Sequence, residues 1–208
     1  MLRAALWMAL IFTLVGTALL AALRAQPYTA PDIRTLIAAP DGCPDPCWQG
    51  IRPGVTTLTM GADTITRHPW VGNLVHIETH PTTTHVRWAW SGAQPAYIDT
   101  TRASWISGVP GRPVTMISLK TTLRFGDLWL QLGRPQARAL GSYTVGGPPL
   151  QFLAYADAVV SFAVWPGCAQ FWHQPVDIVY LPDIGDVDVA GGGYDLALMR
   201  ATACNLDP

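Results

Sequence analysis

The chain has 208 residues and a formal net charge of -1, so it offers no extended basic surface for a phosphate backbone, and nucleic acid is not an expected partner. Only 13 % of the residues are charged, whereas Trp, Gly and Pro number nine, nineteen and eighteen. The Pro and Gly residues do not form a continuous tract, so the composition predicts a loop-rich folded domain with an aromatic core rather than a disordered chain.

The chain begins with a long apolar run. Residues 4–23 carry no charge and are flanked by Arg3 and Arg24. Twenty apolar residues are enough to cross a bilayer as a helix, and the run is longer than the apolar region of most cleaved signal peptides. We therefore expect residues 1–25 to be a signal anchor that spans the cell membrane once through residues 4–23, with the rest of the chain outside the cytoplasm. Cleavage near Ala25, which would give a secreted protein, is the alternative. Residues 26–42 are expected to be a linker.

Four cysteines follow the apolar run: Cys43, Cys47, Cys168 and Cys204. An even number of cysteines outside the cytoplasm predicts disulfides. We favour Cys43 with Cys47, because the prolines between them favour a tight loop, and Cys168 with Cys204. A bond from Cys43 or Cys47 to Cys204 is the alternative. Zinc would need a second pair of soft ligands, and redox chemistry favours Cys-x-x-Cys at a helix N-terminus; the sequence has neither.

Two short helices are predicted, over residues 56–71 ("TTLTMGADTITRHPWV") and 121–135 ("TTLRFGDLWLQLGRP"). In each, threonine hydroxyls can cap the first N–H groups, and a proline follows the end of the helix. The two segments share Thr-Thr-Leu, a later glycine and the final proline. We therefore expect one structural unit to occur twice.

Antiparallel strands are predicted after each helix. In the first hairpin, with His80 opposite His85, the sequence alternates between two faces. One face would carry Val75, Ile77, Val86, Trp88 and Trp90, and the other His76, Glu78, His80, His85 and Arg87. A second hairpin would join 150–155 to 159–165. Further candidate strands are 96–99, 114–119, 176–181 and 195–200. The expected fold is α+β: an N-terminal transmembrane helix followed by two tandem helix-plus-antiparallel-sheet halves, residues 43–110 and 111–208.

A short helix opened by Gly-x-Thr and ending near Leu-Gly-x-Pro, followed by antiparallel strands, resembles the BamE/SmpA-type envelope module. Two such modules in tandem resemble the architecture of β-lactamase inhibitor proteins. "PCWQGIRPGVTT" (46–57) also resembles the start of uncharacterised, membrane-anchored bacterial proteins. The resemblance implies a binding or assembly role in the cell envelope, without catalysis. The matching residues are Gly54, Thr56, Pro69, Thr122, Leu132, Gly133 and Pro135.

The polar face of the first hairpin is the best candidate for chemistry. Three imidazoles and a carboxylate on one strand face could converge on a metal and serve a metal-dependent enzyme. The competing interpretation, which we favour, is a solvated face, because a strand surface offers no enclosed cavity. The candidate ligands are His76, Glu78, His80 and His85. No nucleophile motif such as Gly-x-Ser-x-Gly is present, and no cofactor is expected.

Tryptophans in loop-like contexts raise a second alternative. Exposed indole rings stack on sugars and on apolar ligands, so a row of them would indicate carbohydrate or small-ligand binding. The candidates are Trp48, Trp70, Trp105 and Trp172. Taken together, the sequence predicts a membrane-anchored, extracytoplasmic and non-catalytic protein that binds an unknown protein partner in the cell envelope.

Overall fold

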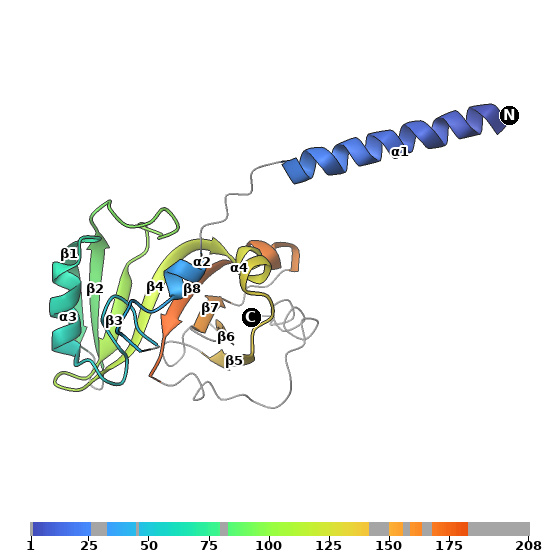
Figure 1. Cartoon of the computed structure of the whole chain (residues 1–208). Helices are drawn as coiled ribbons and strands as arrows, with labels where there is room; N and C mark the ends of the chain where they lie inside the picture. The colour runs from blue at the N-terminus through green and yellow to red at the C-terminus, as the bar shows by residue number, and fades with distance from the viewer. Residues whose placement is uncertain are drawn as a thin grey trace. The chain divides into compact units, whose positions relative to one another are not determined.

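The computed structural model describes residues 2–25, 33–44, 46–79, 83–141, 150–155, 159–163 and 168–182 (Figure 1). The chain divides into two units, Met1–Pro31 and Asp32–Pro208. The first unit holds the helix α1 (Leu2–Ala25). The second holds every strand and the remaining helices, and it contains the hydrophobic core.

Helix α1 exposes apolar side chains along its length. Phe12 is the most exposed of them, and the hydroxyls of Thr13 and Thr17 donate hydrogen bonds to the carbonyls of Ala9 and Thr13 within the helix, both at 2.9 Å. A helix is thus present where one was predicted. Within the part of the chain that the structure describes, no helix has the length and hydropathy needed to cross a membrane.

The second unit is built on one antiparallel sheet in the order β1-β2-β3-β4-β8-β7-β6-β5. With its packed helices, this sheet confirms the predicted α+β class. The order runs outward from a central pair, β4 and β8, to β1 at one edge and β5 at the other. The strands are β1 (Val71–Thr79), β2 (Thr84–Trp90), β3 (Ser104–Gly108), β4 (Val114–Arg124), β5 (Ala137–Gly141), β6 (Leu150–Ala154), β7 (Val159–Ala163) and β8 (Pro175–Tyr180).

Helix α3 (Leu58–Arg67) forms inside the first predicted helical segment. The Thr57 hydroxyl accepts a hydrogen bond from the Met60 N–H at 3.3 Å, which caps the first turn. Gly61 lies on the buried face, where an added Cβ would sit 3.2 Å from Ile106 Cδ1 and 3.3 Å from Val114 Cγ2. The missing side chain therefore lets α3 pack closely on β3 and β4.

Helix α4 (Phe125–Leu132) begins four residues after the start of the predicted helix at 121, because residues 121–124 extend β4. Thr121 is fully buried, and its hydroxyl donates to the Val176 carbonyl of β8 at 2.5 Å. The Arg124 N–H donates to Asp127 Oδ2 at 3.1 Å, so a carboxylate in the first turn satisfies the backbone where the strand becomes a helix. The two Thr-Thr-Leu segments therefore differ in secondary structure: the first leads into helix α3, and the second belongs to strand β4.

The predicted linker contains a short packed helix, α2 (Ile33–Ile37). Both of its end residues are buried. The Ile33 N–H donates to Gln131 Oε1 at 3.2 Å, and Arg34 Nη2 donates to the Gln131 carbonyl at 2.9 Å. Residues 33–37 therefore pack against α4 within the folded unit (Figure 1).

The register of the first hairpin differs from the predicted one. Thr79 lies opposite Thr84 and Ile77 opposite Val86, whereas the prediction placed Ile77 opposite Trp88. The ladder is irregular between Val71 and Asn73 and again between Leu74 and His76. Val86 and Trp88 are buried as predicted, but Val75 and Ile77 are 55 % and 56 % exposed. The pairing of Ile77 moves by two residues, so Ile77 keeps the face of buried Val86 and is exposed because it lies on the outer strand, whereas Val75 has no ladder partner at the irregularity.

Of the other candidate strands, 114–119 and 176–181 lie in β4 and β8, and the second hairpin forms as β6 and β7. Segment 96–99 contributes only the bridge between Ile98 and Thr121. Segment 195–200 lies outside the described residues. β3 and β5 were not predicted.

Candidate functional site

The Cys43–Cys47 disulfide is present, with the two Cα atoms 6.1 Å apart. The second predicted bond, Cys168 to Cys204, involves side chains that the structure does not describe. The loop leads directly into Trp48, whose ring stacks on Trp88 with centroids 5.7 Å apart. The disulfide loop therefore connects to the core through an aromatic pair.

His68, just after α3, connects this loop to the start of β1. The Trp70 N–H donates to His68 Nδ1 at 3.2 Å, and His68 Nε2 lies 3.2 Å from Gln49 Oε1. Because Nδ1 accepts a hydrogen bond, it carries no hydrogen itself. The ring is therefore neutral, with its one N–H hydrogen on Nε2, where it can be donated to Gln49. Burial lowers the pKa of His68, which also favours the neutral form.

The four candidate tryptophans do not form an exposed row. Trp48 and Trp105 are only 2 % and 8 % exposed, so the expectation of surface platforms is wrong for these two. Trp70 is half-buried, and Trp172 is 36 % exposed with one ring face stacked on Phe125 at 5.4 Å. Two of the four rings thus pack inside the fold, as core tryptophans do.

The candidate metal ligands are arranged differently from the predicted set. Glu78 lies opposite His85 in the ladder, and His76 lies opposite Arg87. His80 lies outside the described residues. The His85 ring contacts Trp105 edge to face, with centroids 5.0 Å apart. Within the described parts of the chain, no group of three or more His, Cys, Asp or Glu residues could hold a metal ion.

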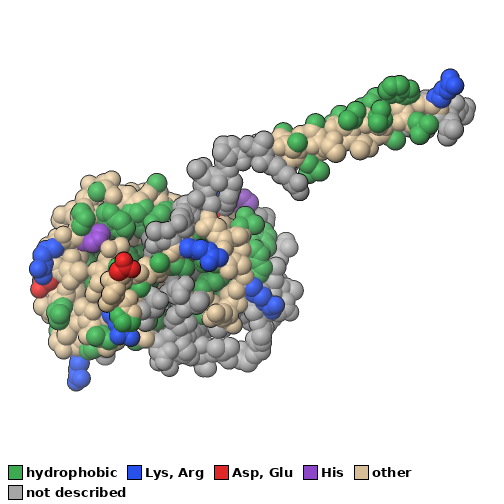
Figure 2. All heavy atoms as spheres, in the orientation of Figure 1, with side chains coloured by type: hydrophobic (Ala, Val, Ile, Leu, Met, Phe, Trp, Pro, Cys, Tyr) green, Lys and Arg blue, Asp and Glu red, His purple; other side chains and the backbone are tan. Residues whose placement is uncertain are grey.

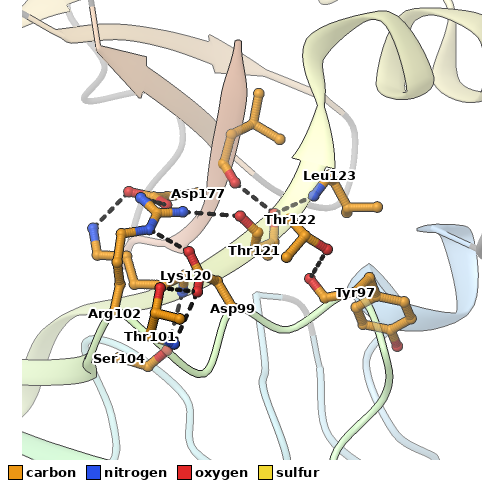
Figure 3. A network of polar contacts seen from close by, with 11 residues as sticks. Tyr97, Asp99, Thr101, Arg102, Ser104, Lys120, Thr121, Thr122, Leu123 and Asp177 are labelled. Carbon is orange, nitrogen blue, oxygen red and sulfur yellow. Dashed lines mark hydrogen bonds and ion pairs between the residues drawn. The ribbon is translucent and has the colours of Figure 1, made fainter. Parts of the chain in front are cut away.

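A charged network lies at the central strand pair, and sequence reasoning missed it (Figure 3). Asp177 of β8 faces two cations: its Oδ2 lies 2.5 Å from Lys120 Nζ of β4, and its Oδ1 lies 3.1 Å from Arg102 Nη1. The side chains of Lys120 and Asp177 are only 15 % and 12 % exposed. Two such charges are stable away from water because they pair with each other.

Arg102 extends the network to a second carboxylate. Its Nε lies 2.6 Å from Asp99 Oδ2, and its Nη2 donates to the Thr121 carbonyl at 2.8 Å. Burial works to raise the pKa of Asp99, but hydrogen bonds from Thr101 and Arg102 outweigh it and hold that pKa below its usual value. Two cations and two anions balance, so the network acts as a charged clamp between β4, β8 and the loop before β3.

At the outer edge of the sheet, β1 has backbone groups that are not paired with another described strand, unlike the central strands. β1 pairs with β2 on one side, and on its other side no strand pairs with it among the residues that the structure describes. Because alternate residues of a strand direct their N–H and C=O groups to opposite sides, part of the β1 backbone faces outward. The exposed residues of the strand are Gly72, Asn73, Val75, Ile77 and Thr79.

Residues 71–79 carry one charged residue, Glu78, and little else that protects an edge strand. They contain no Lys, Arg or Pro, and the exposed apolar residues Val75 and Ile77 are both β-branched. On the face of the second unit seen in Figure 2, charged side chains are scattered rather than gathered into one field. The β1 edge is therefore the candidate functional site, with backbone groups and apolar side chains as its means of recognition.

No family model, no curated protein and no solved structure matches the chain. The candidate site therefore rests on the geometry described above.

Proposed function

We propose that this chain is a non-catalytic, extracytoplasmic protein that binds a protein partner in the cell envelope through the β1 edge. The observation that carries the proposal is the nine-residue strand β1, which among the described residues pairs on one side only and has Val75 and Ile77 more than half exposed. An extended segment of the partner would add to the sheet beside β1. Strand addition gives affinity through main-chain hydrogen bonds and specificity through alternate side chains.

The apolar edge residues set the scale of this interaction. Fully burying a Val or Ile side chain contributes about 1.5 to 3 kcal/mol, and the two edge residues are already half-buried. Ordering the partner and losing its freedom of motion oppose this gain. The expected binding is therefore weak to moderate unless the partner also contacts surfaces beyond the edge.

Placement outside the cytoplasm is supported by the Cys43–Cys47 disulfide, because such bonds persist in oxidising compartments. Attachment to the cell membrane through residues 4–23 is part of the proposal. It rests on their lack of charge and on the hydroxyls of Thr13 and Thr17, which bond within the helix. Alkaline extraction of membranes tests it: retention of the full chain supports an anchor, and release of a chain that begins near Gln26 supports cleavage and secretion.

We also propose that the second unit consists of two copies of one module. A helix followed by four antiparallel strands occurs twice in chain order, as α3 with β1–β4 and as α4 with β5–β8, and the strand order is symmetric about the β4–β8 pair. This division falls between β4 and α4, at 124/125 rather than 110/111. It agrees with the resemblance to tandem BamE/SmpA-type modules, and an experimental structure whose two halves do not superimpose would overturn it.

Site-specific photocrosslinking in native membranes tests the binding site. A photoreactive amino acid replaces Ile77 at the edge and, in a matched control, Thr59, which is exposed on α3. We expect protein adducts from position 77 that are absent from position 59. Equal adducts from both positions, or none from position 77, would refute binding at β1.

A further inference from the structure

We infer that the protein which occupies the β1 edge is a second copy of this chain, paired antiparallel with its own β1 about a two-fold axis at Ile77. This inference rests on the proposed function, because it identifies the partner at the edge proposed above. The reasons lie in the symmetry of antiparallel pairing, in the residue order along β1 and in the place where its ladder is regular.

Symmetry limits the possible registers. A two-fold axis perpendicular to a sheet leaves each residue on its own face, and directly opposed residues of an antiparallel pair share a face. Only registers in which some residue meets its own copy satisfy both conditions. The candidates for the central position are thus few, and each can be judged by the pairs that it creates.

The register centred on Ile77 is self-complementary. It sets position 76, a histidine, opposite position 78, a glutamate, on both sides of the axis, and it sets Ile77 opposite its own copy. A histidine can hydrogen-bond to a glutamate across the pair, and β-branched residues are favourable cross-strand neighbours. Centring on 78 would instead oppose two glutamates, and centring on 76 would set each glutamate against a leucine. Centring on Thr79 would carry the pair past the end of β1, so Ile77 is the centre that avoids these unfavourable pairs.

The self-complementary section is also the regular part of the strand. Both irregularities of the ladder with β2 come before position 76, whereas the four pairs from His76 to Thr79 are in register. Irregularities twist an edge away from new partners, so they discourage pairing along the first part of β1 and leave 76–79 available. The short contact predicts a reversible dimer.

An interface of this kind closes on itself. Both copies use the same surface, so two chains satisfy each other and no further copy adds at β1. The other edge, β5, has a different sequence and takes no part. The product is a dimer in which two eight-stranded sheets continue into one another.

Cysteine crosslinking of the full chain in detergent micelles tests the register. Directly opposed residues have Cβ atoms about 4.5 to 5.5 Å apart, which a disulfide can bridge after a small adjustment. Ile77→Cys is expected to give a covalent dimer on mild oxidation. Glu78→Cys alone should not, but a mixture of Glu78→Cys and His76→Cys chains should crosslink. Thr59→Cys, on the exposed face of α3, is the control for random collision.

Sedimentation of the uncrosslinked protein provides the second measurement. The wild-type chain should show a monomer–dimer equilibrium, and Ile77→Lys should raise its dissociation constant about ten-fold or more, because two lysines would meet at the axis. Ile77→Thr keeps a β-branched residue and serves if the lysine variant loses its native circular dichroism.

The outcomes separate the two proposals. If Ile77→Cys crosslinks no better than Thr59→Cys and the wild type sediments as a monomer, the second-copy inference is refuted. Photocrosslinking from position 77 to a different protein would then still support strand addition at β1. If position 77 gives neither a dimer nor any other adduct, both proposals fail.

Discussion

The central pair β4–β8 and the edge strand β1 belong to the same antiparallel sheet, but the centre buries charged side chains and the edge exposes apolar ones. The centre buries Lys120, Asp177 and part of Arg102, whereas the edge leaves Val75 and Ile77 more than half exposed. Hydrophobic content therefore does not determine which strand is covered. The position of a strand in the sheet determines whether it is covered. Its side chains then need contacts that suit a buried or an exposed environment.

The two regions also differ in how their unfavourable side-chain environments are compensated. The buried charges are neutralised within the chain by paired ions and by hydrogen bonds to the backbone. The exposed apolar residues have no such internal compensation among the described residues, and under our proposal a partner supplies it. The comparison therefore predicts large stability effects at the centre and small ones at the edge.

The largest effect is expected from Asp177→Ala. This change removes the carboxylate that Lys120 and Arg102 share, and breaking a buried ion pair on one side costs about 3 to 5 kcal/mol. Urea unfolding of the second unit, followed by tryptophan fluorescence, measures it. The double variant Lys120→Met with Asp177→Leu should lose less than Asp177→Ala alone. An equal or greater loss in the double variant would show that charge pairing is not what the centre depends on.

A smaller loss is expected from Thr121→Val. The ladder between β4 and β8 shifts register after Lys120, and there the Thr121 hydroxyl donates to the Val176 carbonyl and accepts from the Leu123 N–H. Removing it leaves buried backbone groups unsatisfied, at about 1 to 3 kcal/mol. Thr122→Val, which removes a solvent-exposed hydrogen bond to the Tyr97 carbonyl, is the control and should change the unfolding free energy by no more than about 0.5 kcal/mol. Equal effects from both would contradict the assignment.

Acidification should weaken the contact at His68 before it affects the charged network. The folded state holds the pKa of His68 below 6.5, so the unfolded chain binds the proton more readily, and stability is lost as the pH falls below about 6.5. Asp99, whose pKa lies below 3.8 in the folded state, contributes stability that is lost only below about pH 4. Thermal unfolding between pH 7.5 and 5.5 should show a steeper decline for the wild type than for His68→Gln. Identical slopes would rule out the role of His68.

The smallest effect on stability is expected from Ile77→Thr. The side chain is 56 % exposed and the replacement keeps the β-branch, so the unfolding free energy of the monomer should change by no more than about 0.5 kcal/mol. The same variant should weaken dimer formation. Calorimetry at low protein concentration separates the two quantities, and a loss comparable to that of Asp177→Ala would mean that the edge is part of the core.

The sequence predicts much of the hairpin but not its edge. The alternation along β2 correctly identifies Val86 and Trp88 as buried, because both lie on a regular strand whose one face belongs to the hydrophobic core. The register of β1 depends on two irregularities that have no periodic signal. Gly72 marks one of them, since an added Cβ would lie 3.3 Å from the Trp90 carbonyl oxygen. Val75 has no ladder partner at the second irregularity, and Ile77 is exposed on the outer strand although it lies opposite buried Val86, so alternation could not identify the candidate site.

The central clamp was missed for a different reason. Both strands were predicted, but their pairing joins residues 57 apart in sequence, and local patterns do not report such contacts. A signal was present: Lys120 is the only lysine in the chain, and it lies in an apolar strand, as Asp177 does in another. Single opposite charges in two apolar strands indicate that the strands meet.

The docking of α2 on α4 has a consequence for the order of folding. Ile33 and Gln131 are separated by 98 residues, so the first packed helix of the second unit must wait for one of the later elements. At about 5 to 20 residues per second, the ribosome needs roughly 5 to 20 s to make the intervening chain. During that interval Ile33 and Ile37 lack their native contacts with α4. This part of the core therefore cannot form until α4 has been synthesised.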